Sequence, residues 1–233
     1  MRDVVKGRGQ SEQSIRNRIL QAIFEQRMPP GARLTEEALA EAFAVSRTVI
    51  RQVIARLSQD GILVKRPSGA THVACPTRSE TKQMLAVRRM IEPEIVRTLV
   101  AGLGTFPSVE LLAHLDEEDN ARRAGNRGRL VRLTGEFHLH LARLTKNEVL
   151  VRLMTELQAL ICLAILLYAK GDDACPEDDH RRIVDAVARG NASLSVEIMN
   201  RHLNHIEHDL QLDEPRSEVS ISSTLDWLRG SSV

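Results

Sequence analysis

Two arginines, Arg47 and Arg51, lie one helical turn apart on the polar side of an amphipathic stretch. The apolar residues of this stretch recur at i, i+3, i+4 and i+7, the spacing of one buried helix face: Ile50, Val53, Ile54 and Leu57. The opposite side of the helical wheel is small and polar, and it carries Thr48, Gln52 and Ala55 beside the arginines. A guanidinium presents a planar fork of donors that matches guanine edges and phosphates. The stretch therefore has the chemistry of a helix that enters the major groove of duplex DNA.

The residues before this helix predict a shorter helix and a tight turn. Thr35 is a good N-cap, and Glu36 and Glu37 place negative charge in the first turn, where it suits the helix dipole. The scaffold helix is expected to turn one apolar set inward: Leu39, Ala40 and Phe43. Ala44-Val45-Ser46 then provides the turn, and Ser46 can cap the helix that begins at Arg47. Together these elements predict a helix-turn-helix.

The residues after the second helix predict a two-stranded wing. Gly61 ends the helix, Ile62-Leu63-Val64 begins a strand, and Thr71-His72-Val73 returns after the basic tip Lys65-Arg66-Pro67-Ser68-Gly69. Arginines are common on the exposed face of any helix, so alone they would be weak support for DNA binding. The ordered succession of helix, turn, helix and wing predicts a winged DNA-binding domain.

Charge is distributed unevenly along the chain. Residues 1–77 hold 12 Lys and Arg against 7 Asp and Glu, whereas residues 78–233 hold 20 against 24. A basic N-terminal part on an acidic remainder is typical of phosphate contact confined to one domain. We therefore expect three parts: a DNA-binding domain over 1–77, a second domain over 78–212, and a C-terminal tail over 213–233.

Length and composition exclude several other classes of protein. A chain of 233 residues is long enough for two domains, each with its own core. Cys75, Cys162 and Cys175 show no metal or redox spacing, and the N-terminus lacks the apolar run of a signal peptide, so a cytoplasmic protein with reduced thiols is expected. The most apolar stretch, Leu157 to Tyr168, is too short to span a bilayer and is interpreted as a buried helix. An aromatic content of 3% argues against stacking of single-stranded bases.

The second domain is expected to be entirely helical. The first of its six predicted helices is capped by Ser79, runs to about Gly102, and turns Met84, Val87, Ile91, Ile95 and Leu99 to one side. The others run over about 107–125, 127–145, 148–170, 176–189 and 193–212. Short connections and no strand signals predict an antiparallel bundle of six to seven helices, in which sites are built from side chains on facing helices. The fold class is thus mainly α, a winged helix-turn-helix followed by a helical bundle.

From about residue 14 to 212 the chain resembles the GntR superfamily of transcriptional regulators, in the FadR subfamily whose effector domain is of the FCD type. In the DNA-binding half the resemblance rests on Pro30-Gly31-x-Arg33-Leu34, Leu39-Ala40, Ser46-Arg47-Thr48-x-Ile50-Arg51-x-Val53, Arg56-Leu57 and Gly61. In the effector half it rests on Arg88-x-x-Ile91-Glu92, Phe137-His138, Asn147, His180 and His202-Leu203. The chain departs from the family at Val49, where Pro is common, and at Gln52, where Glu is common, so its base preference is expected to differ.

The resemblance implies residue roles in the DNA-binding half. Arg33, Arg47 and Arg51 match the family's DNA contacts, and Gly69 matches the tip of the wing. Ser46 and Thr48 belong to the same matched motif, and both are included in the predicted DNA-binding set. The resemblance also implies a homodimer on a near-palindromic duplex operator, since one recognition helix reads few base pairs.

The resemblance further implies a metal site in the bundle. In similar FCD proteins the histidines that match His138, His180 and His202 bind a divalent metal, together with an Asp one turn before the first histidine. This chain has Thr134 there, so weaker binding of zinc, nickel or manganese is expected, because a hydroxyl supplies neither charge nor a strong ligand. The alternative is that these histidines are hydrogen-bonded core residues. His140, His205 and His208 are assigned no role, the last two as solvated residues.

Arg88 is a second candidate in the effector domain. Related regulators sense small organic acids, and a guanidinium is a permanently charged, bidentate partner for a carboxylate. The alternative is a structural salt bridge with Glu92, one turn along the helix. Arg88 and Thr134 are therefore the predicted effector-binding residues, and the identity of the acid stays open.

The function expected from these features is a ligand-responsive, DNA-binding transcriptional repressor that is not an enzyme. A metal-free acid sensor of the same type is the first alternative. A metal-dependent enzyme is the second, but no general-base motif accompanies the three histidines. A purely architectural DNA binder would leave the bundle unexplained.

Overall fold

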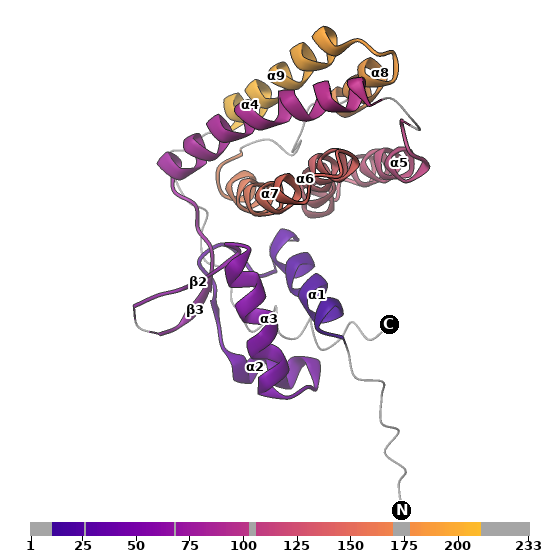
Figure 1. Ribbon diagram of the computed structural model, residues 1–233. Helices are drawn as coiled ribbons and strands as arrows, with labels where there is room; N and C mark the ends of the chain where they lie inside the picture. Colours follow the sequence, from indigo (N-terminus) through magenta and orange to yellow (C-terminus); the bar gives the residue numbers. More distant parts are fainter. Residues whose placement is uncertain (1–10, 26, 68, 103–105, 170–177, 211–233) are drawn as a thin grey trace, which may run out of the picture. The chain divides into compact units, whose positions relative to one another are not determined.

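A computed structural model describes residues 11–25, 27–67, 69–102, 106–169 and 178–210. The chain divides between Ala74 and Cys75 into two compact units, each with its own core (Figure 1). The predicted tail over 213–233 lies outside the described residues. So do the last residue of the helix expected at 148–170 and the first two residues of the helix expected at 176–189.

The first unit is a winged helix-turn-helix. Its elements are α1 (Glu12–Phe24), β1 (Arg33–Leu34), α2 (Glu36–Phe43), α3 (Arg47–Gln59), β2 (Leu63–Lys65) and β3 (Thr71–Val73). The antiparallel sheet has the order β1-β3-β2, with His72 of β3 between Arg33 and Val64. Both α1 and α2 pack on α3. The sequence had not predicted α1 or β1.

Local sequence explains the turn between α2 and α3. The hydroxyls of Thr35 and Ser46 cap these helices as predicted, accepting from the backbone N–H groups of Ala38 and Val49. Ala44 adopts a left-handed φ of 53°, which reverses the chain so that the N–H of Val45 donates to the carbonyl of Ala40 at 3.1 Å. The predicted stripe of α3 is buried, and its arginine-bearing side is exposed.

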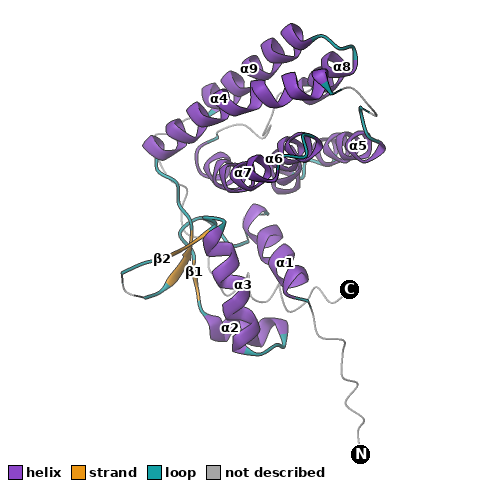
Figure 2. Ribbon diagram, in the orientation of Figure 1, coloured by secondary structure: helices purple, strands orange, loops and turns teal. Residues whose placement is uncertain are grey.

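The second unit is a bundle of helices, with no strand over its described residues (Figure 2). It comprises α4 (Arg78–Ala101), α5 (Val109–Arg123), α6 (Arg127–Leu144), α7 (Glu148–Tyr168), α8 (Asp179–Ala188) and α9 (Ala192–Asp209). The closest pairings are α6 with α7 and α4 with α9, and α5 packs on α6 while α8 packs on α9. This arrangement brings α4, α6, α8 and α9 around one interior.

Two details of α4 differ from the prediction. The N-cap is Thr77 rather than Ser79, because Thr77 and Glu80 form a capping box in which each side chain bonds the other residue's backbone N–H. The inward side also differs, since Val87 is exposed and Ile91 is half-buried whereas Arg88 and Glu92 are fully buried. A pattern based on hydropathy misplaces this stripe because the two charged side chains enter the core as a pair.

The apolar helix α7 begins at Glu148, as expected, and ends at Tyr168. It has 21 residues, and an 18-residue window in it has a mean hydropathy of 2.0, so by length and composition alone the whole helix is long and apolar enough to cross a membrane. In the fold it packs against α6 and α4, and its residues Ile161–Leu167 are buried without interruption. Its place is that of a core helix, as predicted.

Candidate DNA-binding surface and metal centre

The exposed side of α3 carries the predicted arginines, and both are paired with glutamates of α2. Arg47 forms an ion pair with Glu37, while Arg51 donates to Glu36 through Nε at 3.1 Å and Nη2 at 2.9 Å. The hydrogen bonds from Arg51 lower the pKa of the Glu36 carboxyl. Sequence analysis assigned Glu36 and Glu37 only a role in the first turn of α2. It could not predict the ion pairs, because the paired residues lie ten and fifteen positions apart in the chain.

The other predicted DNA-binding residues also lie on the first unit. Thr48 and Ser46 are exposed at the start of α3, where Ser46 also serves as the cap. Arg33 is exposed on β1, at the sheet edge away from β2. Gly69 has a φ of 82° at the tip of the wing, a conformation that favours glycine. These positions are all exposed on the first unit, and their contact with DNA stays a prediction.

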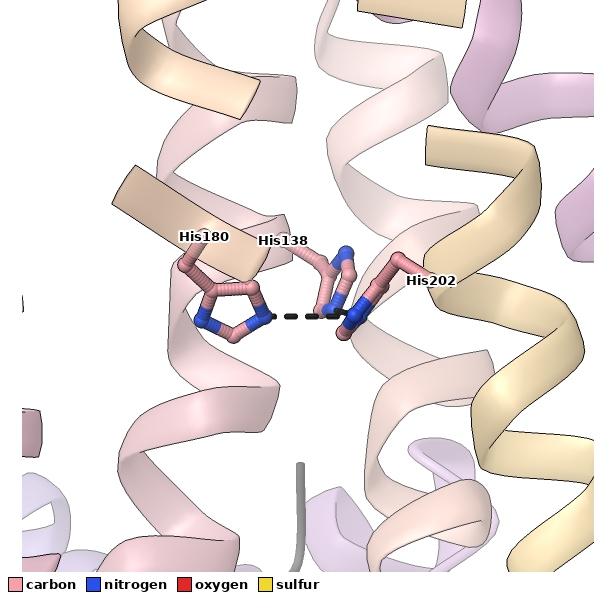
Figure 3. A group of neighbouring side chains, drawn as sticks. All are labelled: His138, His180 and His202. Carbon is pink, nitrogen blue, oxygen red and sulfur yellow. Dashed lines mark hydrogen bonds between the residues drawn. The ribbon is translucent and has the colours of Figure 1, made fainter. Parts of the chain in front are cut away.

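The three predicted histidines of the second unit converge. His138 on α6, His180 on α8 and His202 on α9 point their Nε2 atoms toward one another (Figure 3). The Nε2 of His202 lies 3.3 Å from that of His138 and 3.4 Å from that of His180, and all three side chains are buried. Two nitrogens bound to a tetrahedral zinc at about 2.05 Å are separated by about 3.3 Å. The spacing therefore matches ligands of one small divalent cation.

A carboxylate lies behind each of the three imidazoles. Nδ1 of His138 is 2.6 Å from Glu92, Nδ1 of His180 is 2.8 Å from Glu118, and Nδ1 of His202 is 3.4 Å from Asp179. A carboxylate at Nδ1 favours the tautomer that is protonated there, so the lone pair is left on Nε2. Three lone pairs that face one another at these distances repel unless a cation lies between them. The donor set therefore fits a divalent metal.

The ionisation states of the side chains around the three histidines favour a bound cation. Burial lowers the pKa of His138 to about 3, against the opposing effect of Glu92, so the imidazole is neutral at neutral pH. Burial would raise the pKa of Glu92, but Arg88 and His138 together hold it well below its ordinary value. Burial acts likewise on Glu118, whose pKa is nevertheless lowered by His180 and His114. His138 is thus a neutral potential ligand, and Glu92 and Glu118 are ionised carboxylates behind the histidines.

The sequence missed most of these outer residues. Glu118 and Asp179 were not predicted, because their partners His180 and His202 lie on other helices. His114 was not predicted either, although it contacts Glu118 one turn along the same helix. His205, expected to be solvated, also contacts Asp179 at 3.2 Å although its side chain is 44% exposed. His140 lies against the ring of His114 instead of joining the three histidines.

The three histidines line a small cavity of about 10 Å³, and both predicted effector-binding residues line it as well. Arg88 is 1% exposed and its Nε forms the expected ion pair with Glu92 at 2.5 Å. Thr134 is buried one turn before His138, and its hydroxyl donates to the carbonyl of Val131 at 3.1 Å. Gln158 and Cys162 of α7 line the same cavity, and the sequence had not singled out Gln158. Arg88 thus forms the salt bridge with Glu92 and also lines the cavity, so both roles considered for it are compatible with the structure.

One close approach brings α6 and α7 together beside this cavity. A Cβ added at Gly135 would lie 2.5 Å from the Sγ of Cys162, so any larger residue there would require the Cys162 side chain to shift. Burial raises the pKa of the Cys162 thiol to about 12, which keeps it protonated. Its Sγ donates toward the carbonyl of Val131 at 3.5 Å.

Known families match both units. The model of bacterial regulatory proteins of the gntR family matches residues 11–73, and the FCD domain matches residues 83–205. The HTH-type transcriptional regulator LutR of Bacillus subtilis (strain 168) is 28% identical over 77% of this chain and 92% of its own length. A probable D-xylose utilization operon transcriptional repressor of Paenarthrobacter nicotinovorans is 25% identical over 81% of this chain and 84% of its own.

Solved structures share the fold. A transcriptional regulator GntR from Rhodococcus sp. RHA1 superposes with a TM-score of 0.73 at 21% identity, over 84% of this chain and 95% of its own. McbR/YncC of E. coli gives a TM-score of 0.67 at 19% identity, over 84% and 97%. Since the two family models together cover both units, the chain belongs to the GntR family of bacterial transcriptional regulators and carries an FCD domain behind its helix-turn-helix.

Proposed function

We propose that the protein is a ligand-responsive transcriptional repressor whose helical unit senses a small organic acid with the help of a bound divalent metal. The observation that carries the proposal is the convergence of three buried, carboxylate-backed histidines on a cavity that Arg88 also lines. His138, His180 and His202 would hold the metal, which would supply a positive centre for an acid. Arg88 would add a guanidinium that carboxylates bind well. The repressor role is supported by the name of one relative and by nothing in the site.

The DNA-binding domain in this proposal spans 1–77 and contacts DNA through Arg33, Ser46, Arg47, Thr48, Arg51 and the wing at Gly69. The effector domain spans 78–212, and the protein acts in the cytoplasm. A metal-free acid sensor is the second candidate, because Arg88 lines the cavity and a guanidinium can bind a carboxylate without a metal. An enzymatic role has no support from the relatives, which are regulators.

The test begins with a duplex operator selected by the purified protein from a random-sequence library. A gel-shift assay then measures binding to this operator with a panel of acids, each with and without zinc. We expect at least one acid to change operator affinity, and metal analysis of protein prepared without chelator to find zinc, nickel or manganese. Acid effects that are unaltered by thorough chelation would favour the metal-free sensor. No response to any acid would contradict ligand sensing.

We also propose that the protein acts as a homodimer on a near-palindromic operator. Two recognition helices one turn of DNA apart read enough base pairs to select a site in a genome. Light scattering should give twice the chain mass of 26.0 kDa at micromolar concentration. A monomer both with and without operator DNA would contradict this.

A further inference from the structure

The exposed side of α3 has a central row of neutral side chains. On a helical wheel of about 100° per residue, this row lies opposite the buried stripe that begins at Ile50. Its members recur at i, i+4, i+7 and i+11, the spacing of one helix face, and all four are exposed: Thr48, Gln52, Ala55 and Gln59. The side chains of α3 that project farthest from the core of the first unit are therefore uncharged.

The arginines of α3 lie on the two flanks of this row. Arg47 and Arg51 lie on one flank, where glutamates of α2 engage both of them. Arg56 is exposed on the opposite flank. When a helix enters the major groove, cations on its flanks lie toward the phosphate backbones, while the centre of its outer face lies toward the base edges. The central row is thus the part of α3 that is placed to read sequence.

Gln52 is the member of this row that is best equipped to distinguish base pairs. It lies in the second turn of α3, and recognition helices contact base edges through residues near their N-terminal end. Its side-chain amide has both a donor and an acceptor. In the part of the chain that the structure describes, no other residue forms a hydrogen bond with this amide. Both groups are therefore available to a base.

We infer that Gln52 is a specificity-determining residue, which selects an A·T pair at one position of each operator half-site through a bidentate contact with adenine. The inference rests on the proposed DNA contacts of α3 and deepens them. The amide oxygen accepts from N6 of adenine while the amide nitrogen donates to N7. Adenine is the only base that presents a donor beside an acceptor in the major groove.

Ala55 supports the same base pair. It follows Gln52 by one turn on the central row and is exposed. Its short side chain lets the helix backbone come close to the floor of the groove, and a methyl group makes a favourable apolar contact with the 5-methyl group of thymine. Gln52 and Ala55 therefore favour the two bases of an A·T pair, or of neighbouring A·T pairs.

The experiment selects operators from a random duplex library with the full chain, as wild type and as variants of Gln52. Wild type should select adenine at one position of each half-site. Gln52→Ala should accept any base at that position, with its preference for adenine reduced about tenfold or more. Gln52→Glu has only acceptors, so its preference at the same position should change to cytosine, which presents the N4 donor.

Gln59 offers matched controls. It has the same side chain on the same row, but it lies two turns further along, in the last turn of α3. Gln59→Ala should leave the selected sequence unchanged at every position. Gln59→Glu introduces the same charge as Gln52→Glu, and it should weaken binding to all duplexes alike. Both glutamines are exposed, so all four variants should keep the wild-type melting temperature within a few degrees.

Competition between duplexes that differ at this one position gives the base preference as a ratio of affinities, so a uniform loss of affinity does not enter it. An unchanged preference in Gln52→Ala and Gln52→Glu would overturn the inference and leave DNA binding by α3 intact. A preference lost at a position where wild type does not select adenine would overturn the assigned base pair, as would an equal loss in Gln59→Ala. Failure of wild type to select any sequence would overturn both the inference and the proposed DNA contacts.

Discussion

Arginine–glutamate pairs occur in both units, and their surroundings are opposite. Arg51 and Glu36 pair on an open surface, where their side chains are 67% and 37% exposed. Arg88 and Glu92 pair inside the bundle, where each is 1% exposed. Exposed pairs contribute little to stability because water and salt compete with them, whereas breaking a buried pair leaves a charge without solvent. The exposed pairs can exchange their glutamates for phosphates, while the buried pair is a fixed part of the site.

The largest expected effect comes from breaking the buried pair. Glu92→Gln should lower the free energy of unfolding of the metal-free protein by about 3–5 kcal/mol, because it leaves the Arg88 guanidinium uncompensated in the core. Urea unfolding followed by circular dichroism measures this loss. Glu94→Gln is the matched control on the exposed side of α4, and it should change stability by less than about 0.5 kcal/mol.

A double variant sharpens the same comparison. Arg88→Met combined with Glu92→Leu removes both charges and should recover most of the stability lost in Glu92→Gln. If Glu92→Gln is no more destabilising than Glu94→Gln, the buried pair does not have the energetic role assigned to it.

The next effect concerns the exposed arginines as DNA contacts. Arg47→Ala or Arg51→Ala should weaken specific operator binding by about 1–3 kcal/mol if each reads a base, and should leave the free energy of unfolding nearly unchanged. Gel shifts with selected and scrambled duplexes measure the loss of discrimination. Arg97→Ala in the second unit, which breaks an exposed pair with Glu94, is the control. Tight, sequence-specific binding by the double arginine variant would contradict the assigned recognition surface.

The smallest effect concerns the glutamates that hold these arginines. Glu36→Gln and Glu37→Gln should each raise affinity for scrambled duplex DNA by less than about tenfold, since a competing carboxylate is removed from a screened surface. The gain should shrink as salt is raised. Glu12→Gln changes the net charge equally at the start of α1, and it should have a smaller effect. Equal effects of all three variants would mean that net charge, not pairing, sets the affinity.

Local patterns predicted the recognition helix well, because caps and apolar spacing act within a few residues. Ser46 and the stripe of α3 were correct for this reason. The capping box of α4 was also within reach, since Glu80 follows Thr77 by three residues. The two-residue strand β1 was beyond reach, because it exists only through its pairing with β3.

The site was only partly predictable. The three histidines came from family positions, and the structure confirms that they converge. The inward turn of Arg88 and Glu92 could not follow from hydropathy, which treats charged residues as exposed. Glu118 contacts His180, which lies 62 residues further along the chain, so sequence spacing could not predict this contact. Gln158 becomes a candidate site residue only because it lines the cavity.

Gly135 bears on which substitutions could change the size of the cavity. A side chain there would come within 2.5 Å of the Sγ of Cys162, so this close approach of α6 and α7 depends on glycine at one position and on the small thiol at the other. Descendants that adapt to bulkier acids would have to remodel the cavity from the isoleucines of α7 and α9, where a smaller apolar residue leaves the backbone in place. Substitution of Ile161, Ile165 or Ile206 therefore changes the size of the cavity more directly than substitution of Gly135.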